Sequence, residues 1–404
     1  LFQDAAGSTP VTAVEQPVGR ILDKSGRGNH ATQATTTKRP VYSRRVNLLT
    51  KTEQFDDAVW APTNITPTLG QVGISGVAPV AVRLTPTTAN GAHGFKALFV
   101  SGRNGTTHSA YLKADGYSKV GFKESSTSGW FAAFDLSTAA VLSSTPGALP
   151  TIQALAGGWC RISFSPVTTN AGQSFDVRVL PNSYVSGDTN AATFVGDGVS
   201  AVLMCGPQLE DGLTATPYQW VNTATDYDAG PSKFPAYRRL DGVDDSHASA
   251  TGGGGTAGFF FSSAVSPQGG AGTARTLFSD AGTNTGYIVR LNTSNQLELA
   301  AGNGTTYTTV ATSGTLAVGT TDIVQAWDDG TNLNVKIGNG ATASIARPTV
   351  SAGTAGYTMG QDNGASTGYF NGRIYSTIYR KDSGLTQVQR ESVALYQRQK
   401  ARKP

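Results

Sequence analysis

The sequence predicts an all-β protein built from antiparallel β-sandwich or jelly-roll domains, with a short helix at its C-terminus. Of its 404 residues 49 are Gly and only 14% are charged, so turn formers are abundant and good helix formers are scarce. Hydrophobic residues reach 38%, with 16 Phe, 14 Tyr and 5 Trp, which is more apolar surface than a disordered chain supplies. At roughly 100 to 200 residues per domain, this length suits two or three domains.

Short alternating runs between clusters of Gly, Asn and Ser predict the strands of the first half. The run GWCRISFSPV places Cys160, Ile162 and Phe164 on one face of a strand, and SFDVRVLP repeats the alternation. Residues 109–125 and 198–210 are further strand candidates. Strands of this length and spacing are typical of a sandwich or a jelly roll.

A second group of strands begins near Pro235. Residues 286–302 and 322–340 each have the pattern of a hairpin, and the second one turns at Asp328, Asp329 and Gly330. Residues 368–381 supply one more strand. The second half is therefore also expected to be a β-structure.

The period changes only at the end of the chain. Val388, Ser392, Leu395 and Gln399 recur at helical spacing, which predicts a short helix with a narrow apolar stripe. Thr386 followed three residues later by Gln is a variant of the capping box. The basic tail RQKARKP then lies at the helix C-terminus, where the helix dipole favours positive charge, so we expect it to stabilise the helix rather than to bind a ligand.

Composition also weighs against several classes of protein. The net charge of +4 is small and is not gathered into a stripe, so nucleic-acid binding is not expected. There is no apolar run of 18 residues, so membrane insertion is not expected either. Cys160 and Cys205 have no metal-binding spacing, and we expect both to be core residues, with a single bridge as the alternative.

Two groups of motifs carry a family resemblance. VGRILDKSGRGNHATQATTTKRPVY (18–42) and YRRLDGVDDS (237–246) resemble successive parts of the concanavalin A-like (LamG-like) sandwich domains of phage and prophage structural proteins. NLLTKTEQFDDAVWAP (47–62), GWCRISFS (158–165) and GPQLEDGLTATPYQWV (206–221) resemble the jelly-roll carbohydrate-binding-like domains of phage fibres. The motifs run from residue 18 to residue 246, and the resemblance to these two kinds of domain covers nearly the whole chain.

The order of the motifs implies that one domain interrupts the other. Residues 1–45 form the first part of the concanavalin A-like sandwich, residues 46–222 form the inserted jelly roll, and residues 223–404 complete the sandwich and add the helix. Insertion into an exposed loop is tolerated when the ends of the inserted domain lie close together.

The resemblance implies a virion protein of the fibre, spike or head-decoration type. It would be located on the surface of the particle, contact other virion proteins, form a homo-oligomer such as a trimer, and bind bacterial surface glycan without catalysis. Three alternatives remain open at this point: a purely architectural virion component, a bacterial secreted or surface carbohydrate-binding protein, and a glycan depolymerase.

Catalytic patterns are weak in this sequence. A glycosidase needs two carboxylates held about 5 to 5.5 Å apart in the retaining case, and no two glutamates lie within thirty residues of each other. Asp135, Glu210 and Asp211 are the candidates for a pair assembled from distant strands. A Ser/His/Asp arrangement would need one of four histidines, which lie in Gly- or Thr-rich stretches where a solvated histidine is the default: His30, His93, His108 and His247.

No cofactor is firmly implied, and Ca²⁺ is the one candidate. Ca²⁺ takes six to eight oxygen ligands, and closely spaced Asp residues on a turn can donate several. Asp241, Asp244 and Asp245 form such a group, for which a plain turn is the alternative. The run DDGTNLN (328–334) offers more oxygens, but a hairpin turn already explains it.

Glycan binding needs exposed aromatic rings, because the C–H face of a pyranose packs against them while nearby polar groups bind its hydroxyls. Four aromatic residues follow turns and are expected at the rim of a sheet, with a core position as the alternative: Tyr117, Trp130, Tyr307 and Tyr369. Trp327 alternates with Ile323 and Gln325, so the pattern does not decide whether its ring faces the core or the solvent.

Overall fold

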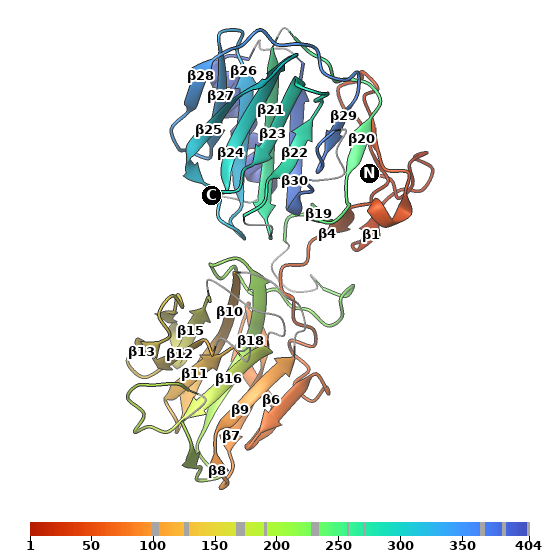
Figure 1. Cartoon of the computed structure of the whole chain (residues 1–404). Helices are drawn as coiled ribbons and strands as arrows, with labels where there is room; N and C mark the ends of the chain where they lie inside the picture. Colours follow the sequence, from red (N-terminus) through yellow and green to blue (C-terminus); the bar gives the residue numbers. More distant parts are fainter. Residues whose placement is uncertain are drawn as a thin grey trace. The chain divides into compact units, whose positions relative to one another are not determined.

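The chain folds into two compact units, one of which is discontinuous in sequence. The computed structural model describes residues 1–98, 105–124, 129–166, 174–189, 192–227, 234–256, 258–269, 272–363, 368–381 and 385–401. Leu1–Arg44 and Pro235–Pro404 form one unit, here called the split unit, and Arg45–Phe234 form the other, here called the inserted unit (Figure 1). The fold is all-β with antiparallel sheets and one C-terminal helix, which confirms the predicted fold class.

The split unit contains two eight-stranded sheets. Sheet I has the strand order β1 (Gln16–Pro17), β4 (Val41–Ser43), β19 (Tyr237–Asp241), β30 (Asn371–Arg380), β21 (Phe259–Pro267), β26 (Asp322–Asp328), β27 (Asn332–Ile337), β28 (Ala343–Ala346). Sheet II has the order β2 (Arg20–Ile21), β3 (Ala31–Thr32), β20 (His247–Ser249), β29 (Tyr357–Met359), β22 (Arg275–Ser279), β23 (Thr285–Leu291), β24 (Gln296–Asn303), β25 (Tyr307–Thr315).

Strand pairing joins the N-terminal segment to the C-terminal half. In sheet I, Tyr42 on β4 lies opposite Arg238 on β19, and in sheet II, Thr32 on β3 lies opposite Ala248 on β20. A 3₁₀ turn, η1 (Thr36–Lys38), connects β3 to β4. The stretch from residue 18 to residue 42 therefore completes both sheets of a unit whose other strands lie some 200 residues further along the chain.

Aromatic residues from both sheets fill the core of the split unit. Phe259 and Phe261 from sheet I contact Phe278 from sheet II at ring-centroid distances of 5.5 and 5.8 Å. Phe259 also stacks on Tyr287 of β23 at 4.7 Å. All four residues are buried, so the alternation of apolar residues along these strands marks the faces that meet between the sheets.

The inserted unit has two six-stranded sheets and a two-stranded ribbon. Sheet III has the order β14 (Thr151–Ala154), β15 (Trp159–Phe164), β10 (Thr106–Asp115), β18 (Ala201–Asp211), β7 (Ala78–Pro86), β6 (Ile65–Ile74). Sheet IV has the order β13 (Ala140–Ser144), β12 (Phe131–Asp135), β11 (Lys119–Lys123), β16 (Ser174–Leu180), β9 (His93–Leu98), β5 (Trp60–Thr63). The ribbon pairs β17 (Phe194–Val195) with β8 (Asn90–Gly91), and a 3₁₀ turn, η2 (Ala156–Gly158), precedes β15.

Hydrogen bonds tie the two ends of the inserted unit together. The Gln219 side-chain oxygen accepts from the backbone N–H groups of Val46 and Asn47 at 2.5 and 3.0 Å. The N–H of Thr52 donates to the carbonyl of Val221 at 3.0 Å. Asn47 and Thr52 belong to the first motif of the unit and Gln219 and Val221 to the last, so these motifs bring its ends together.

The C-terminal helix α1 (Gln387–Ala401) forms, but it docks through a face that the sequence did not predict. Val388 and Leu395 are 71% and 59% exposed, whereas Gln397 and Ala401 are buried. Gln397 accepts a hydrogen bond from Ser262 Oγ at 2.5 Å and donates to the Ser262 carbonyl at 2.8 Å. Ala401 also packs with Ala264 and Ile323, so the helix docks on sheet I through this face and not through the predicted apolar stripe.

Other local predictions are confirmed. The Gln389 side chain accepts from the N–H of Thr386 at 2.9 Å, and the hydroxyl of Thr386 accepts from the N–H of Gln389 at 3.3 Å, as in a capping box. Cys160 and Cys205 are both buried and unbridged. Residues 402–404 of the basic tail lie outside the described residues.

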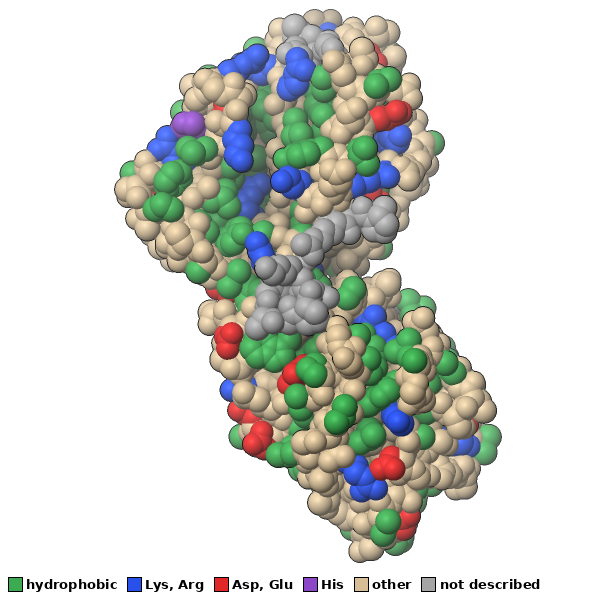
Figure 2. Space-filling model, turned by 180° about the vertical axis from the view of Figure 1, so that it is seen from behind, with side chains coloured by type: hydrophobic (Ala, Val, Ile, Leu, Met, Phe, Trp, Pro, Cys, Tyr) green, Lys and Arg blue, Asp and Glu red, His purple; other side chains and the backbone are tan. Residues whose placement is uncertain are grey.

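The surface carries charges of both signs. On the face shown in Figure 2, Lys and Arg side chains lie on both units, among polar and apolar side chains. Among the described residues, no helix combines the length and the apolar character needed to cross a bilayer.

Candidate functional site

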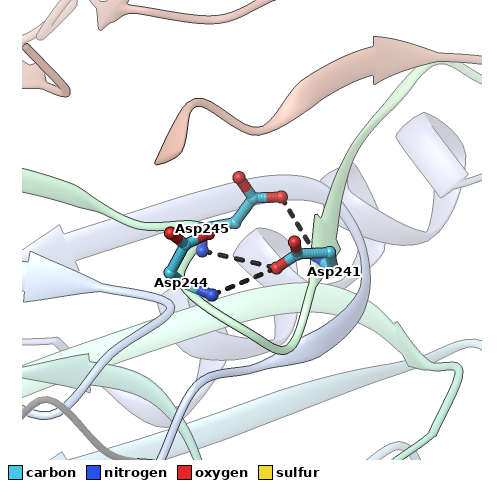
Figure 3. Close-up of side chains that lie close together, drawn as sticks. All are labelled: Asp241, Asp244 and Asp245. Carbon is cyan, nitrogen blue, oxygen red and sulfur yellow. Dashed lines mark hydrogen bonds between the residues drawn. The ribbon is translucent and has the colours of Figure 1, made fainter. Parts of the chain in front are cut away.

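Asp241, Asp244 and Asp245 come together at the end of β19 (Figure 3). One carboxylate oxygen from each residue lies within 4.8 Å of the others. Asp241 Oδ1 accepts from the N–H of Val243 at 2.8 Å, and Asp245 Oδ2 accepts from the N–H of Asp241 at 3.0 Å. The chain thus forms a tight turn that holds three acidic groups on one side.

The electrostatics of this cluster depend on Asp245. Asp241 is exposed and Asp245 is buried. Burial, followed by the nearby charges of Asp241 and Asp244, raises the pKa of Asp245 to about 7. Near neutral pH the Asp245 carboxyl is therefore protonated in part, which lowers the negative charge of the cluster. The oxygens of the cluster are also the ligands that Ca²⁺ prefers.

Replacing Asp245 by Asn should change how the stability of the split unit depends on pH. The folded pKa lies above the unfolded value of about 3.9, so the wild-type carboxyl favours folding most below pH 4. That contribution is lost as the pH rises through about 7, by at most about 1.4 kcal/mol for each pH unit. We expect the Asp245→Asn variant to lack this decline in urea unfolding measured from pH 4 to pH 8.

Asp244→Asn is the matched control, since it removes one charge from the same turn and should leave most of the decline in place. Identical pH profiles for wild type and Asp245→Asn would contradict the assignment. Added Ca²⁺ would show whether the cluster binds a metal ion or only a proton. A cation bound to these oxygens would displace the proton and reduce the decline of wild-type stability with pH.

Two of the four predicted aromatic residues are not at a rim. Tyr117 and Trp130 are each only 9% exposed and pack into the core of the inserted unit. The residues before them, Gly116 and Gly129, have φ of +102° and +64°, which marks a turn at both positions. The expected exposure of Tyr117 and Trp130 is wrong.

The other two, Tyr307 and Tyr369, remain partly exposed. The Tyr307 hydroxyl donates to the Gly282 carbonyl at 2.7 Å, which holds the ring over the outer face of sheet II. Its pKa is raised by burial and by the charge of Asp362. A Cβ atom placed on Gly368, next to Tyr369, would lie 3.9 Å from Cβ of Asp362, so the segment that carries Tyr369 also approaches Asp362.

The carboxylates considered for catalysis are engaged in local structure. Asp135 Oδ1 accepts from the N–H and hydroxyl of Ser137 at 2.9 and 2.6 Å. Glu210 accepts from Gln208 Nε2 at 2.7 Å and from the N–H and hydroxyl of Thr216 at 2.8 and 2.6 Å. Asp211, the third candidate, is buried at the end of β18.

The histidines differ from expectation. His93, His108 and His247 are buried rather than solvated. His108 lies among phenylalanine rings, 5.5 Å from Phe164 by ring centroids, and burial lowers its pKa to about 3. His30 Nδ1 accepts from the N–H of Asp23 at 3.0 Å.

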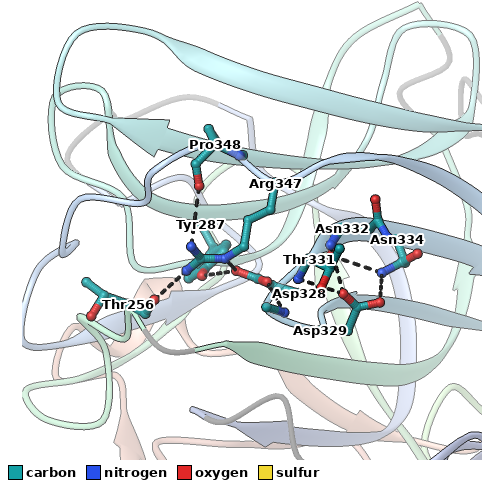
Figure 4. A network of polar contacts seen from close by, with 10 residues as sticks. Thr256, Tyr287, Asp328, Asp329, Thr331, Asn332, Asn334, Arg347 and Pro348 are labelled. Atoms are coloured by element: carbon teal, nitrogen blue, oxygen red, sulfur yellow. Dashed lines mark hydrogen bonds and ion pairs between the residues drawn. The ribbon is translucent and has the colours of Figure 1, made fainter.

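The run from Asp328 to Asn334 is a hairpin turn joined to a buried ion pair (Figure 4). Asp329 accepts from the N–H groups of Thr331 and Asn332 at 2.9 and 2.7 Å. Asp328 Oδ2 accepts from Tyr287 Oη and from Arg347 Nε, both at 2.6 Å. N–H, hydroxyl and guanidinium groups of the protein therefore donate to the carboxylate oxygens that a metal ion would need.

Sequence reasoning missed an aromatic cluster on the outer face of sheet III. Tyr111, Trp159 and Tyr218 are buried there, and Trp220 packs against them while remaining partly exposed. A signal was available, because Trp159 alternates with Cys160 and so shares the outward face already assigned to Arg161.

Comparison with known proteins shows distant structural likeness. No protein-family model and no curated protein matches the sequence. Domains LG4-5 of the mouse laminin alpha1 chain share 9% identity, over 79% of this chain and 94% of that chain, with a TM-score of 0.30. A Bacteroides ovatus protein described as carbohydrate binding shares 11% identity, over 75% of this chain and 80% of that chain, with a TM-score of 0.32.

The LG1-3 region of the laminin alpha2 chain is similar to the same extent. It shares 11% identity, over 73% of this chain and 62% of that chain, with a TM-score of 0.27. Scores this low carry no inference about what this chain binds.

Proposed function

We propose that this chain is a non-enzymatic phage virion protein, a fibre, spike or head-decoration component that binds bacterial surface glycan through loops of its β-sandwich. The observation that carries the proposal is the partly exposed Tyr307 near the charge of Asp362, with the partly exposed Tyr369 next to Gly368, which also approaches Asp362. The phage assignment and the location on the virion surface are supported by the motif resemblance alone.

This arrangement has the chemistry that a sugar requires. A partly exposed aromatic ring offers an apolar face to the C–H groups of a pyranose, and a neighbouring carboxylate accepts hydrogen bonds from its hydroxyls. Asp362 is already held in place, because its Oδ1 accepts from the hydroxyl of Ser279 at 2.9 Å. A single shallow site of this kind binds weakly, so assembly into a homo-oligomer, such as a trimer, would raise the avidity.

A printed array of bacterial surface polysaccharides tests the proposal. The wild-type chain should bind at least one capsular or lipopolysaccharide glycan, and the double variant Tyr307→Ala/Tyr369→Ala should bind it about tenfold more weakly. Tyr396→Ala is the matched control, because this tyrosine is 49% exposed on α1 and should not affect binding.

The alternatives predict different results. A chain that co-purifies with virion particles but binds no glycan would be architectural. Release of reducing ends from a polysaccharide would show a depolymerase and contradict the non-enzymatic part of the proposal.

A further inference from the structure

Aromatic residues on the outer face of sheet III form a cluster, here called the aromatic floor, that is separate from the main core of the inserted unit. Tyr111 of β10, Trp159 of β15 and Tyr218 pack together there, each no more than 7% exposed. The guanidinium of Arg161 lies over the Tyr111 ring, 5.4 Å from its centroid. Trp220 packs against this floor and keeps part of its ring exposed.

The two ends of the inserted unit bring a carboxylate to this aromatic floor. The N–H of Lys51 donates to the Asn222 carbonyl, and the N–H of Thr52 donates to the Val221 carbonyl, both at 3.0 Å. Glu53 lies in the turn that follows, and its carboxylate accepts from the hydroxyl of Tyr218. Glu53 and Trp220 therefore border the same aromatic cluster.

Glu53 has few partners for a partly buried acid. Its Oε1 accepts from the hydroxyl of Tyr218 at 3.3 Å. Within the part of the chain that the structure describes, Glu53 forms no ion pair, and its Oε2 accepts no hydrogen bond. Burial raises its pKa above the ordinary value for glutamate.

Closing the inserted unit does not require this acid. The aromatic packing and the backbone bonds between residues 51–52 and 221–222 already hold the two ends. A partly buried carboxylate without a cation lowers stability, and such groups gather at binding sites. The rings alone would suit an apolar protein partner, but a free carboxylate oxygen beside them suits a ligand that presents hydroxyl groups.

We propose that Trp220 and Glu53 form a second sugar-binding subsite, on the inserted unit, that takes a neutral pyranose. The apolar face of the sugar packs on the Trp220 ring, and two of its hydroxyls donate to the Glu53 carboxylate. An acidic sugar is disfavoured by the same negative charge. This inference rests on the proposed function, and it adds a site that is separate from Tyr307 and Tyr369.

Isothermal titration compares the wild-type full chain with three variants, Trp220→Ala, Trp220→Phe and Glu53→Gln. The titrant is the neutral polysaccharide fragment that binds most tightly on the array. We expect binding about tenfold weaker for Trp220→Ala, close to wild type for Trp220→Phe, and several-fold weaker for Glu53→Gln. The decisive readout is the melting temperature of Glu53→Gln, which should be equal to or above that of wild type, because the substitution removes a partly buried charge.

Each other outcome counts against a defined claim. Unchanged affinity in Trp220→Ala and Glu53→Gln would overturn the subsite while leaving the proposed function intact. A lower melting temperature in Glu53→Gln, in step with weaker binding, would show a structural role and also overturn it. If the wild-type chain binds no glycan, the proposed function fails, and the subsite fails with it.

Discussion

Replacing Asp328 by Ala should destabilise the split unit by about 3–5 kcal/mol. Asp328 is fully buried and accepts from Tyr287 Oη and Arg347 Nε, each at 2.6 Å. Because β23 belongs to sheet II and β26 to sheet I, the Tyr287 bond links the two sheets. Removing the carboxylate leaves the guanidinium of Arg347 without its counter-ion and leaves a buried hydroxyl unpaired.

Urea unfolding followed by tyrosine fluorescence and circular dichroism would measure the change. Asp329→Ala is the control, since it removes an acid from the same turn but breaks only local bonds, and should cost about 1 kcal/mol. Equal losses for the two variants would show that the ion pair contributes nothing beyond the turn.

Replacing Asn47 by Ala should have a comparable effect on the inserted unit, about 3 kcal/mol or more. The Asn47 side chain is fully buried. Its Nδ2 donates to the carbonyls of Pro207 and Gln219, both at 3.0 Å, and its Oδ1 accepts from the N–H groups of Leu49 and Leu209 at 3.1 and 3.2 Å. Truncation removes all four of these bonds to buried backbone groups.

The loss should appear as a lower unfolding midpoint for the inserted unit with little change in that of the split unit. Asn222→Ala is the matched control, because this partly exposed residue also joins the two ends of the unit, through Lys51 Nζ at 3.0 Å, yet its groups can bind water. A shift of both midpoints by Asn47→Ala would contradict the view that this network belongs to one unit.

The sequence predicted strands well and the facing of individual side chains less well. Alternation correctly placed Cys160, Ile162 and Phe164 in a core, because every second residue of a strand meets the opposite sheet. Periodicity shows which residues share a face, but it does not show which face packs. In α1 the face that carries Gln397 and Ala401 packs on sheet I, and the predicted apolar stripe is left exposed.

The prediction of site residues from the sequence has the same limit, because it does not show which side chains face the solvent. Tyr117 and Trp130 follow turns, as do Tyr307 and Tyr369, and the glycines before Trp130 and Tyr369 have nearly the same φ, +64° and +69°, so the turn by itself does not separate inward from outward. The Asp241 cluster was predictable because its members lie within five residues of one another. The closeness of Glu53 and Trp220 to one cluster was not, because 167 residues separate them and only the folded ends of the unit bring them together.

The signature motifs acquire a structural meaning that the sequence alone did not provide. Asn47 of the first motif and Gln219 of the last form hydrogen bonds that join the two ends of the inserted unit, and Gln208 accepts from the N–H of Gln219 within the last motif. Ends held close together are what allows one domain to interrupt a loop of another. These motifs are therefore more direct evidence for the domain architecture than for a ligand.

Hydrogen exchange of the full chain in mild denaturant, read by mass spectrometry, tests the central claim that the N-terminal segment belongs to the C-terminal fold. Amides of β4 should open with the same free energy as those of β19 and β30, and with a different one from those of β10 and β18. Exchange of residues 41–43 in step with β10 and β18, or well before β19, would contradict it.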